Sequence, residues 1–317
     1  MRLFVFLTAV LLSASAQGQD YPSRPIRFIV SFPPGGSSDL IARAIAPRMA
    51  ERMGQPVLVE NRPGAGGNIG VDAVAKSLPD GYTIGLAAAG ALSSNSSLYP
   101  SMPFHPEKDL APISMLAIIP FFLVAHPSQP ASLRQLIDMA KTKPGAIAIG
   151  YGGNGSTMHL AGELFNMMAG VKLQPVPYKG SGPVSADVLG GQVPLGVVDV
   201  PSAIAHVRAG KMRALAVTSK RRIVAAPEVP TFEEAGVPGY EAIGWFGMVA
   251  PAGTSADVIG RLNREIAAAL SVPEIRERAL AAGAEPFTNT PQEFAAMIRE
   301  ETSKWAQVIR TAEIKLQ

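Results

Sequence analysis

Short apolar runs alternate along this chain with longer segments in which apolar residues recur every three or four positions. The first apolar run covers residues 26–31, and helical spacing follows over 38–53. A second run at 57–60, a helix ending near Lys76 and a third run at 82–88 continue the pattern. This strand–helix–strand–helix–strand order predicts a parallel sheet with helices on both faces.

The alternation begins again near residue 121 and ends in three helical segments. Further strands are expected at 121–125, 146–150, 174–177, 195–198, 214–218 and 246–250, helices at 133–141 and 156–169, and late helices at 256–270, 273–282 and 291–309. The late helices have no local strands to pair with, so we expect them to pack back on the first domain. The chain is therefore predicted to be an α/β protein of two lobes, each a mainly parallel sheet flanked by helices. We expect lobe 1 to comprise 17–121 plus 247–317 and lobe 2 to comprise 122–246, with a cleft between them.

Two glycine turns have the same design. Phe32-Pro33-Pro34-Gly35-Gly36-Ser37-Ser38 precedes Asp39, and one offset aligns it with Tyr151-Gly152-Gly153-Asn154-Gly155-Ser156-Thr157, which precedes Met158 and His159. Each turn follows an apolar run and opens a helical pattern. A helix start leaves backbone N–H groups unpaired and directed at one point. Two such points facing each other would form a clamp for an anion.

The first residues have the features of a secretory signal peptide. A positive start, Met1-Arg2, is followed by a short apolar run and by Ser13-Ala14-Ser15-Ala16. Roughly ten apolar residues are too few for a membrane span, which needs about 20. We expect export to the periplasm with cleavage near Ala16, so that residues 1–16 are removed.

Composition excludes several classes of protein. The 317 residues are 47% hydrophobic and 17% charged, which suits a two-domain globular protein. No cysteine occurs, so neither disulfides nor a thiolate metal site can form. The formal net charge is +3, becoming +2 without Arg2, and the basic residues are scattered. This distribution argues against a nucleic-acid partner.

Motifs of cofactor and catalytic chemistry are incomplete. Residues 150–155 match the dinucleotide fingerprint, but the region 173–179 lacks the acidic residue that the fingerprint requires. Neither glycine turn carries the lysine of a phosphate loop. The four histidines lack metal-ligand spacing, and no Gly-x-Ser-x-Gly elbow occurs. We therefore expect no cofactor, no metal and no catalytic residues.

Each polar or aromatic candidate has a structural as well as a functional interpretation. The hydroxyls of Ser37, Ser38, Ser156 and Thr157 suit helix capping and also donation to a carboxylate. The helix dipole favours an acidic residue such as Asp39 in the first turn. Its functional alternatives are to hold the glycine turn or to accept a hydrogen bond from a ligand. His159, Lys179 and Asp199 would either face the cleft or lie on the surface or in packing. Phe32 and Tyr151 would flank the anion or belong to the core.

Ordered motifs across nearly the whole mature chain resemble one family. These are YPSRPI (21–26), FPPGGSSD (32–39), ENRPGAGG (60–67), PDGYT (79–83), STMHLAGEL (156–164), VPYKG (176–180), GGQV (190–193), ALAVT (214–218), VPTFEEAG (229–236) and APAGT (250–254). Together they resemble the solute-binding proteins of tripartite tricarboxylate transporters, the Bug receptors.

The resemblance implies a two-lobed periplasmic binding protein, similar to type II, that closes on a small organic carboxylate and delivers it to the membrane permease. It also implies that the carboxylate is held by backbone N–H groups, hydroxyls and waters rather than by arginine. The residues expected at the ligand are Phe32, Gly35, Gly36, Ser37, Ser38, Asp39, Ala88, Ser93, Tyr151, Gly153, Asn154, Gly155, Ser156, Thr157, His159, Lys179 and Asp199.

Three functions remain open at this point. The first is carboxylate capture for transport, by a protein that we expect to be a monomer. The second is signalling of the bound carboxylate to a sensor kinase. The third is an exported hydrolase, for which the sequence offers neither a nucleophile with its base nor a metal site. Which carboxylate is bound (tricarboxylate, dicarboxylate, acidic amino acid or aromatic acid) is not determined by the motifs.

Overall fold

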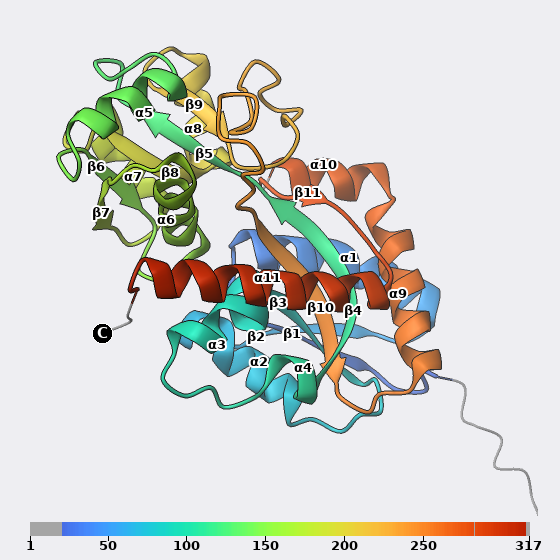
Figure 1. Ribbon diagram of the computed structural model, residues 1–317. Coiled ribbons are helices and arrows are strands. Elements are labelled where there is room, and N and C mark those ends of the chain that lie inside the picture. Colours follow the sequence, from blue (N-terminus) through green and yellow to red (C-terminus); the bar gives the residue numbers. More distant parts are fainter. Residues whose placement is uncertain (1–20, 282, 315–317) are drawn as a thin grey trace, which may run out of the picture.

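Two sheets form two lobes in the computed structural model, which describes residues 21–281 and 283–314 (Figure 1). The expected signal peptide, residues 1–16, lies outside the described residues. No helix within the described ranges combines the length and apolarity needed to cross a membrane. The two-lobed α/β architecture predicted from the apolar pattern is confirmed.

The larger sheet has six strands in the order β11-β4-β10-β3-β1-β2. Its strands are β1 (Ile26–Val30), β2 (Val57–Asn61), β3 (Thr83–Ala88), β4 (Leu110–Ile119), β10 (Gly244–Pro251) and β11 (Glu285–Pro286). Strand β1 pairs in parallel with β2 and β3, whereas β10 runs antiparallel to β3 and β4, and β11 antiparallel to β4. The sheet is therefore mixed rather than mainly parallel.

The smaller sheet has five strands in the order β7-β6-β8-β5-β9. Its strands are β5 (Phe121–Ala125), β6 (Ala148–Tyr151), β7 (Gln174–Pro177), β8 (Leu195–Asp199) and β9 (Arg213–Val217). Strand β6 pairs in parallel with β7 and β8, and β5 runs antiparallel to β8 and β9. In both sheets, each antiparallel pair includes a strand next to a crossing between the lobes. Antiparallel pairing does not need the helical crossover that connects parallel strands.

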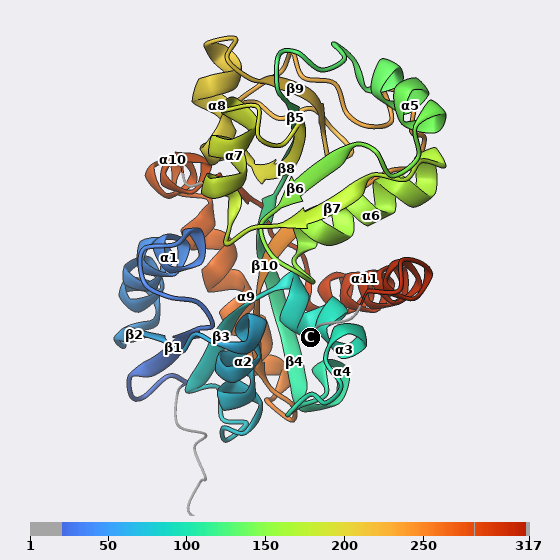
Figure 2. The same ribbon diagram turned by 90° about the vertical axis from the view of Figure 1, so that its left-hand side faces the viewer.

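The chain crosses between the lobes twice. Pro120 alone separates β4 of the larger sheet from β5 of the smaller one. After β9, residues 218–243 lead back to β10 of the larger sheet. At these crossings the start of β10, which pairs with the end of β3, lies beside the start of β5. The two lobes face each other (Figure 2).

Helices cover both faces of each sheet. On the larger sheet, one apolar cluster includes residues of α1, α9 and α10, and the opposite cluster includes residues of α2 and α11. On the smaller sheet, α5 and α6 cover one face, and α7 and α8 the other. The helices are α1 (Ser37–Met53), α2 (Asn68–Ala75), α3 (Asn95–Leu98), α4 (Pro106–Asp109), α5 (Leu133–Thr142), α6 (Thr157–Ala169), α7 (Ser181–Leu189), α8 (Val200–Arg208), α9 (Ala256–Leu270), α10 (Pro273–Ala281) and α11 (Pro291–Thr311).

The last helix, α11, packs on both lobes. Phe294 and Ile298 in its first half join a cluster of the larger sheet. Trp305, Val308 and Ile309 in its second half join the cluster beneath α6 of the smaller sheet. Helices α9 and α10 pack on the first lobe as expected, but α11 is shared because its apolar residues continue for its whole length. Figure 1 shows it extending from the larger sheet to α6.

Candidate ligand-binding site

A cavity of about 360 Å³ lies between the lobes. Its walls come from strand ends and turns of both sheets: Phe32, Gly66, Ala88, Gly90, Asn95, Leu98, Tyr99, Ile119, Phe121, Gly152, Gly153, Asn154, Gly155, Ser156, Thr157, Met158, Gly244 and Phe246. None of these described residues carries a charged side chain. The lining is mostly apolar, with polar groups at the lobe-2 turn and on the lobe-1 wall. An anion bound here would thus be held by N–H and hydroxyl groups.

The lobe-2 turn supplies a continuous stretch of the lining, residues 152–158, where β6 leads into α6. Ser156 is the N-cap, and its hydroxyl accepts the His159 N–H at 3.2 Å. Among the described residues, neither the N–H nor the hydroxyl of Thr157 has a hydrogen-bond partner, as expected for the first residue of a helix. The helix dipole adds positive potential at this point. The turn therefore offers N–H and hydroxyl donors at a point of positive potential, an arrangement that suits a carboxylate.

Tyr151 and His159 support this turn from beneath. The Tyr151 hydroxyl donates to Asn154 Oδ1 at 2.8 Å, and His159 Nδ1 accepts the Gly155 N–H at 3.1 Å. The two rings stack with centroids 4.1 Å apart and planes 6° apart. Burial, together with the charge of Glu163, raises the pKa of Tyr151 to about 12, so the hydroxyl stays a donor at neutral pH. Both residues hold the turn and neither lines the cavity.

Aromatic side chains form much of the opposite wall. Phe32 at the end of β1 and Phe246 in β10 have ring centroids 6.4 Å apart. Phe246 pairs in register with Ala88 of β3, which also lines the cavity. Phe121 at the start of β5 closes the wall beside Gly244, where an added Cβ would lie only 3.0 Å from the Phe121 ring. This wall suits the apolar body of a small organic ligand.

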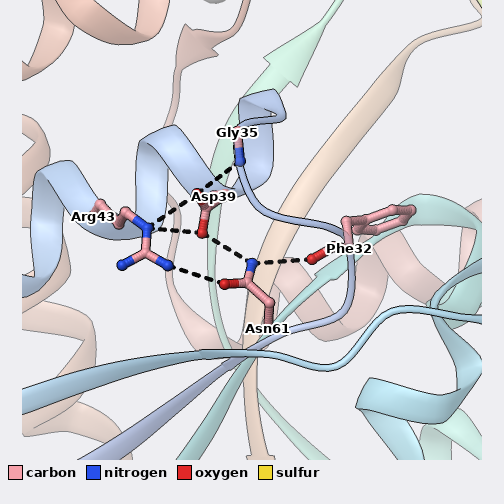
Figure 3. A network of polar contacts seen from close by, with 5 residues as sticks. All are labelled: Phe32, Gly35, Asp39, Arg43 and Asn61. Carbon is pink, nitrogen blue, oxygen red and sulfur yellow. Dashed lines mark hydrogen bonds and ion pairs between the residues drawn. The ribbon is translucent and has the colours of Figure 1, made fainter.

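The lobe-1 turn is organised around Asp39 (Figure 3). The buried Asp39 carboxylate accepts from Gly35 N–H at 2.9 Å, from Arg43 Nε at 3.0 Å and from Asn61 Nδ2 at 2.9 Å. Asn61 Nδ2 also donates to the Phe32 carbonyl oxygen at 3.0 Å, which fixes the cavity residue Phe32. Burial alone would raise the pKa of Asp39, but hydrogen bonds from Arg43, Gly35 and Asn61 outweigh it and lower that pKa. Asp39 is thus a charged support of the turn.

Not all residues expected at the ligand lie in the cavity. Those that line it are Phe32, Ala88, Gly153, Asn154, Gly155, Ser156 and Thr157. Those outside its lining are Gly35, Gly36, Ser37, Ser38, Asp39, Ser93, Tyr151, His159, Lys179 and Asp199.

Three of the residues outside the lining have identifiable structural surroundings. The Ser93 hydroxyl donates to the Ala89 carbonyl oxygen at 2.6 Å, within the π-helical turn Gly90–Ser94 and its flank. Asp199 caps α8, with its Oδ1 accepting the Ser202 N–H at 3.0 Å. Lys179 is exposed.

The structure adds lining residues that sequence reasoning did not name as ligand contacts. Asn95 and Leu98 of α3 and the adjacent Tyr99 belong to this group. They follow the segment that contains Ala88 and Ser93, two residues expected at the ligand, but no local motif distinguishes them. Gly66 belongs to the glycine-rich turn 63–67, whose composition was the available signal. Phe121 and Phe246 each come shortly after a crossing, at the start of an expected strand.

A larger hollow, of about 580 Å³, lies beside this cavity and shares Tyr99 with it. It is otherwise lined by residues between Ser96 and Asp109 and by Thr302 of α11. Neither glycine turn contributes to it, and it lies within lobe 1 and α11. The interlobe cavity is therefore the better candidate for a ligand that both lobes must hold.

The family model of the tripartite tricarboxylate transporter family receptor matches residues 41–314. The chain belongs to this receptor family. BugT of Bordetella pertussis is 42% identical over 314 residues, covering 98% of this chain and 96% of BugT. These receptors are solute-binding proteins and not enzymes, in agreement with the absence of a catalytic motif.

Two similar receptors of known structure are described with a carboxylate ligand. Rpa4515 from R. palustris, described with adipate, is 37% identical with a TM-score of 0.78, covering 94% of this receptor and 100% of that chain. MatC from Rhodopseudomonas palustris, described with bound malate, is 31% identical with a TM-score of 0.74, covering 91% of this receptor and 100% of that chain. The two-lobed fold of this receptor is thus that of periplasmic binding proteins that bind small acids.

Proposed function

We propose that this receptor captures a small organic carboxylate in the periplasm and delivers it to a tripartite tricarboxylate-type permease. The observation that carries this proposal is the start of α6, where Thr157, whose N–H and hydroxyl have no hydrogen-bond partner among the described residues, lines the interlobe cavity. A carboxylate at this point would accept charge-assisted hydrogen bonds without a buried cation. The adipate and malate described with similar receptors support the same ligand class.

Lobe closure is the mechanism that this site favours. The α6 turn belongs to lobe 2, while Phe32, Ala88 and Phe246 belong to lobe 1, so a bound acid would contact both lobes. A ligand that contacts both lobes binds the closed form more tightly than the open form and shifts the population toward it. The permease would then distinguish the closed receptor from the open one by its shape.

A panel of carboxylates and their neutral amides tests the capture function. Thermal unfolding of the mature protein would be followed with citrate, malate, succinate, adipate, aspartate and benzoate, each beside its amide. At a hundredfold excess over the dissociation constant, a ligand stabilises a protein by roughly 3 kcal/mol. We expect at least one carboxylate to raise the melting temperature while its amide does not. A panel without any such shift would refute the proposal.

Delivery is tested separately by uptake. A tripartite tricarboxylate-type permease would be placed in vesicles, and uptake of the acid identified by the panel would be measured with and without receptor. We expect uptake only when the receptor is present. Binding without receptor-dependent uptake would instead favour a signalling role for the same closed form.

A further inference from the structure

The lobe-1 wall of the cavity contains a buried amide whose oxygen has no partner. Asn95 is only 4% exposed, yet it lines the cavity. Its Nδ2 donates to Asn68 Oδ1 at 2.7 Å and approaches the Gly66 carbonyl oxygen at 3.5 Å. Within the described residues, no group donates to Asn95 Oδ1. The described side-chain atoms that are fully buried without a partner do not include Oδ1, so this atom is accessible from the cavity that Asn95 lines, where a ligand or water can bond it.

The orientation of the Asn95 amide follows from its neighbours. Turning the amide over would place Oδ1 against the Gly66 carbonyl oxygen, so that two acceptors would face each other. Asn68 is itself fixed, because its Nδ2 contacts Met102 Sδ at 3.2 Å and its Oδ1 is used by Asn95. The Oδ1 atom therefore remains directed toward Gly90, another lining residue, where an added Cβ would lie 3.3 Å from it.

The Tyr99 hydroxyl is a second polar group on the same wall. No hydrogen bond to this hydroxyl occurs in the part of the chain that the structure describes. An ideal Cβ built on Gly66 would lie 3.0 Å from the Tyr99 hydroxyl and 3.3 Å from Asn95 Nδ2, so both side chains approach the same glycine. Gly66 has a φ of +64°, which glycine adopts without strain. The missing side chain leaves room for Tyr99 and Asn95 to reach the cavity together.

We propose that Asn95 Oδ1 and the Tyr99 hydroxyl form a subsite for a hydrogen-bond donor, and that the ligand is a carboxylic acid carrying a hydroxyl or ammonium group. This inference rests on the proposed capture of a carboxylate at the α6 turn, and it adds the chemistry of the ligand's other end. An amide oxygen accepts from a hydroxyl or ammonium, but it repels a second ionised carboxylate. A site built to bond such a donor discriminates against the analogue that lacks it, because Oδ1 is then left unpaired.

Matched pairs of acids test the subsite in the unmodified protein. Titration calorimetry would compare malate with succinate, lactate with propionate, 3-hydroxybenzoate with benzoate, and aspartate with succinate. In the pair that binds most tightly, we expect the donor-bearing acid to bind at least about tenfold more tightly, the value of one hydrogen bond. Equal or tighter binding of the acid without the donor would overturn the subsite while leaving carboxylate capture intact. Absence of binding by every acid would overturn both.

Three variants test which side chains cause the preference for the donor-bearing acid. Tyr99→Phe removes a hydroxyl without a partner and should retain the fold, while the ratio of the two affinities in the preferred pair falls several-fold. Asn95→Leu should bring that ratio close to one. Ser96→Ala, in the same helix but outside the lining, is the control and should leave the ratio unchanged. An unchanged ratio in Tyr99→Phe would remove Tyr99 from the subsite, and an unchanged ratio in a folded Asn95→Leu would overturn the proposal. If Asn95→Leu fails to fold, the wild-type pairs and Tyr99→Phe decide.

Discussion

His159 Nδ1 lies 3.1 Å from the backbone nitrogen of Gly155 and accepts its hydrogen bond. Asp39 makes the same contact with Gly35 at 2.9 Å in the other lobe. In both turns, the acceptor is the third residue of the helix and the donor precedes the N-cap. The two turns are thus equivalent at an offset of 120 residues, one more than the glycine pattern indicates. The glycine N–H is already used in both turns, so a ligand at the lobe-2 turn, which lines the cavity, would meet the N–H groups that follow Gly155.

Thr157→Val should weaken carboxylate binding by roughly 5- to 100-fold. The replacement keeps the size and branching of the side chain but removes the hydroxyl of Thr157, a residue that lines the cavity. A hydrogen bond to a charged group contributes about 1.5–3 kcal/mol, of which a backbone donor next to it can replace part. The dissociation constant of the tightest acid in the panel, measured by calorimetry, checks this prediction.

Thr142→Val is the matched control for that measurement. Its hydroxyl donates to the Met139 carbonyl oxygen at the end of α5, away from the cavity. We expect its affinity to remain within twofold of the wild type. Equal affinities in the two variants would show that the Thr157 hydroxyl does not contact the acid.

His159→Leu should destabilise the lobe-2 turn more than His159→Asn. Leucine leaves the Gly155 N–H without its acceptor, which costs about 1–3 kcal/mol when the group is buried. Asparagine offers a short oxygen acceptor, the type of group that Asp39 provides at the same helical position in lobe 1. Denaturant unfolding of the two variants gives the comparison. If the two variants are equally stable, His159 contributes to stability by packing its ring on Tyr151 and not by the hydrogen bond.

Asp39→Asn should lower the stability measured at pH 6 and have a smaller effect at pH 3. The pKa of Asp39 in the folded protein lies below its ordinary value, because the hydrogen bonds from Arg43, Gly35 and Asn61 outweigh burial. The stability from this carboxylate is therefore present above its unfolded pKa of about 3.9 and is lost as pH falls through the folded pKa. Melting temperatures of both proteins across this range test the sign. A difference that grows as the pH falls would contradict it.

The periodicity of the sequence was sufficient to predict the repeated strand–turn–helix units. The helix expected at 38–53 is α1, Ser37–Met53, and that expected at 156–169 is α6, Thr157–Ala169. Local patterns define these units because a strand, a glycine turn and a capped helix are specified by adjacent residues. Strand direction is not local: β10 pairs antiparallel with β3 only because the chain returns from the other lobe.

The residues that line the cavity were less predictable for the same reason. The turn 152–158 lines it, whereas the aligned lobe-1 turn contributes only Phe32. Asn95 and Tyr99 enter through a short helix after β3, and their polar groups meet at Gly66 through tertiary packing alone. The late helix 291–309 was expected on the first lobe. A helical apolar pattern gives the buried face of α11 but not the partners of its two halves.

Trp305→Ala should destabilise the receptor by about 3–5 kcal/mol and separate the unfolding of the lobes. Trp305 is 1% exposed, packs in the lobe-2 cluster and donates from Nε1 to Glu301 Oε2 at 2.7 Å. The first half of α11 is held in lobe 1 by Phe294, so the helix links the two cores. Without the Trp305 anchor, lobe 2 should unfold at a lower temperature than lobe 1. Calorimetry should show one transition in the wild type and in the control Thr311→Ala, which changes an exposed residue of the same helix, and two in Trp305→Ala. A single transition in Trp305→Ala, lowered as a whole, would mean that the strands crossing between the lobes are sufficient for their coupling.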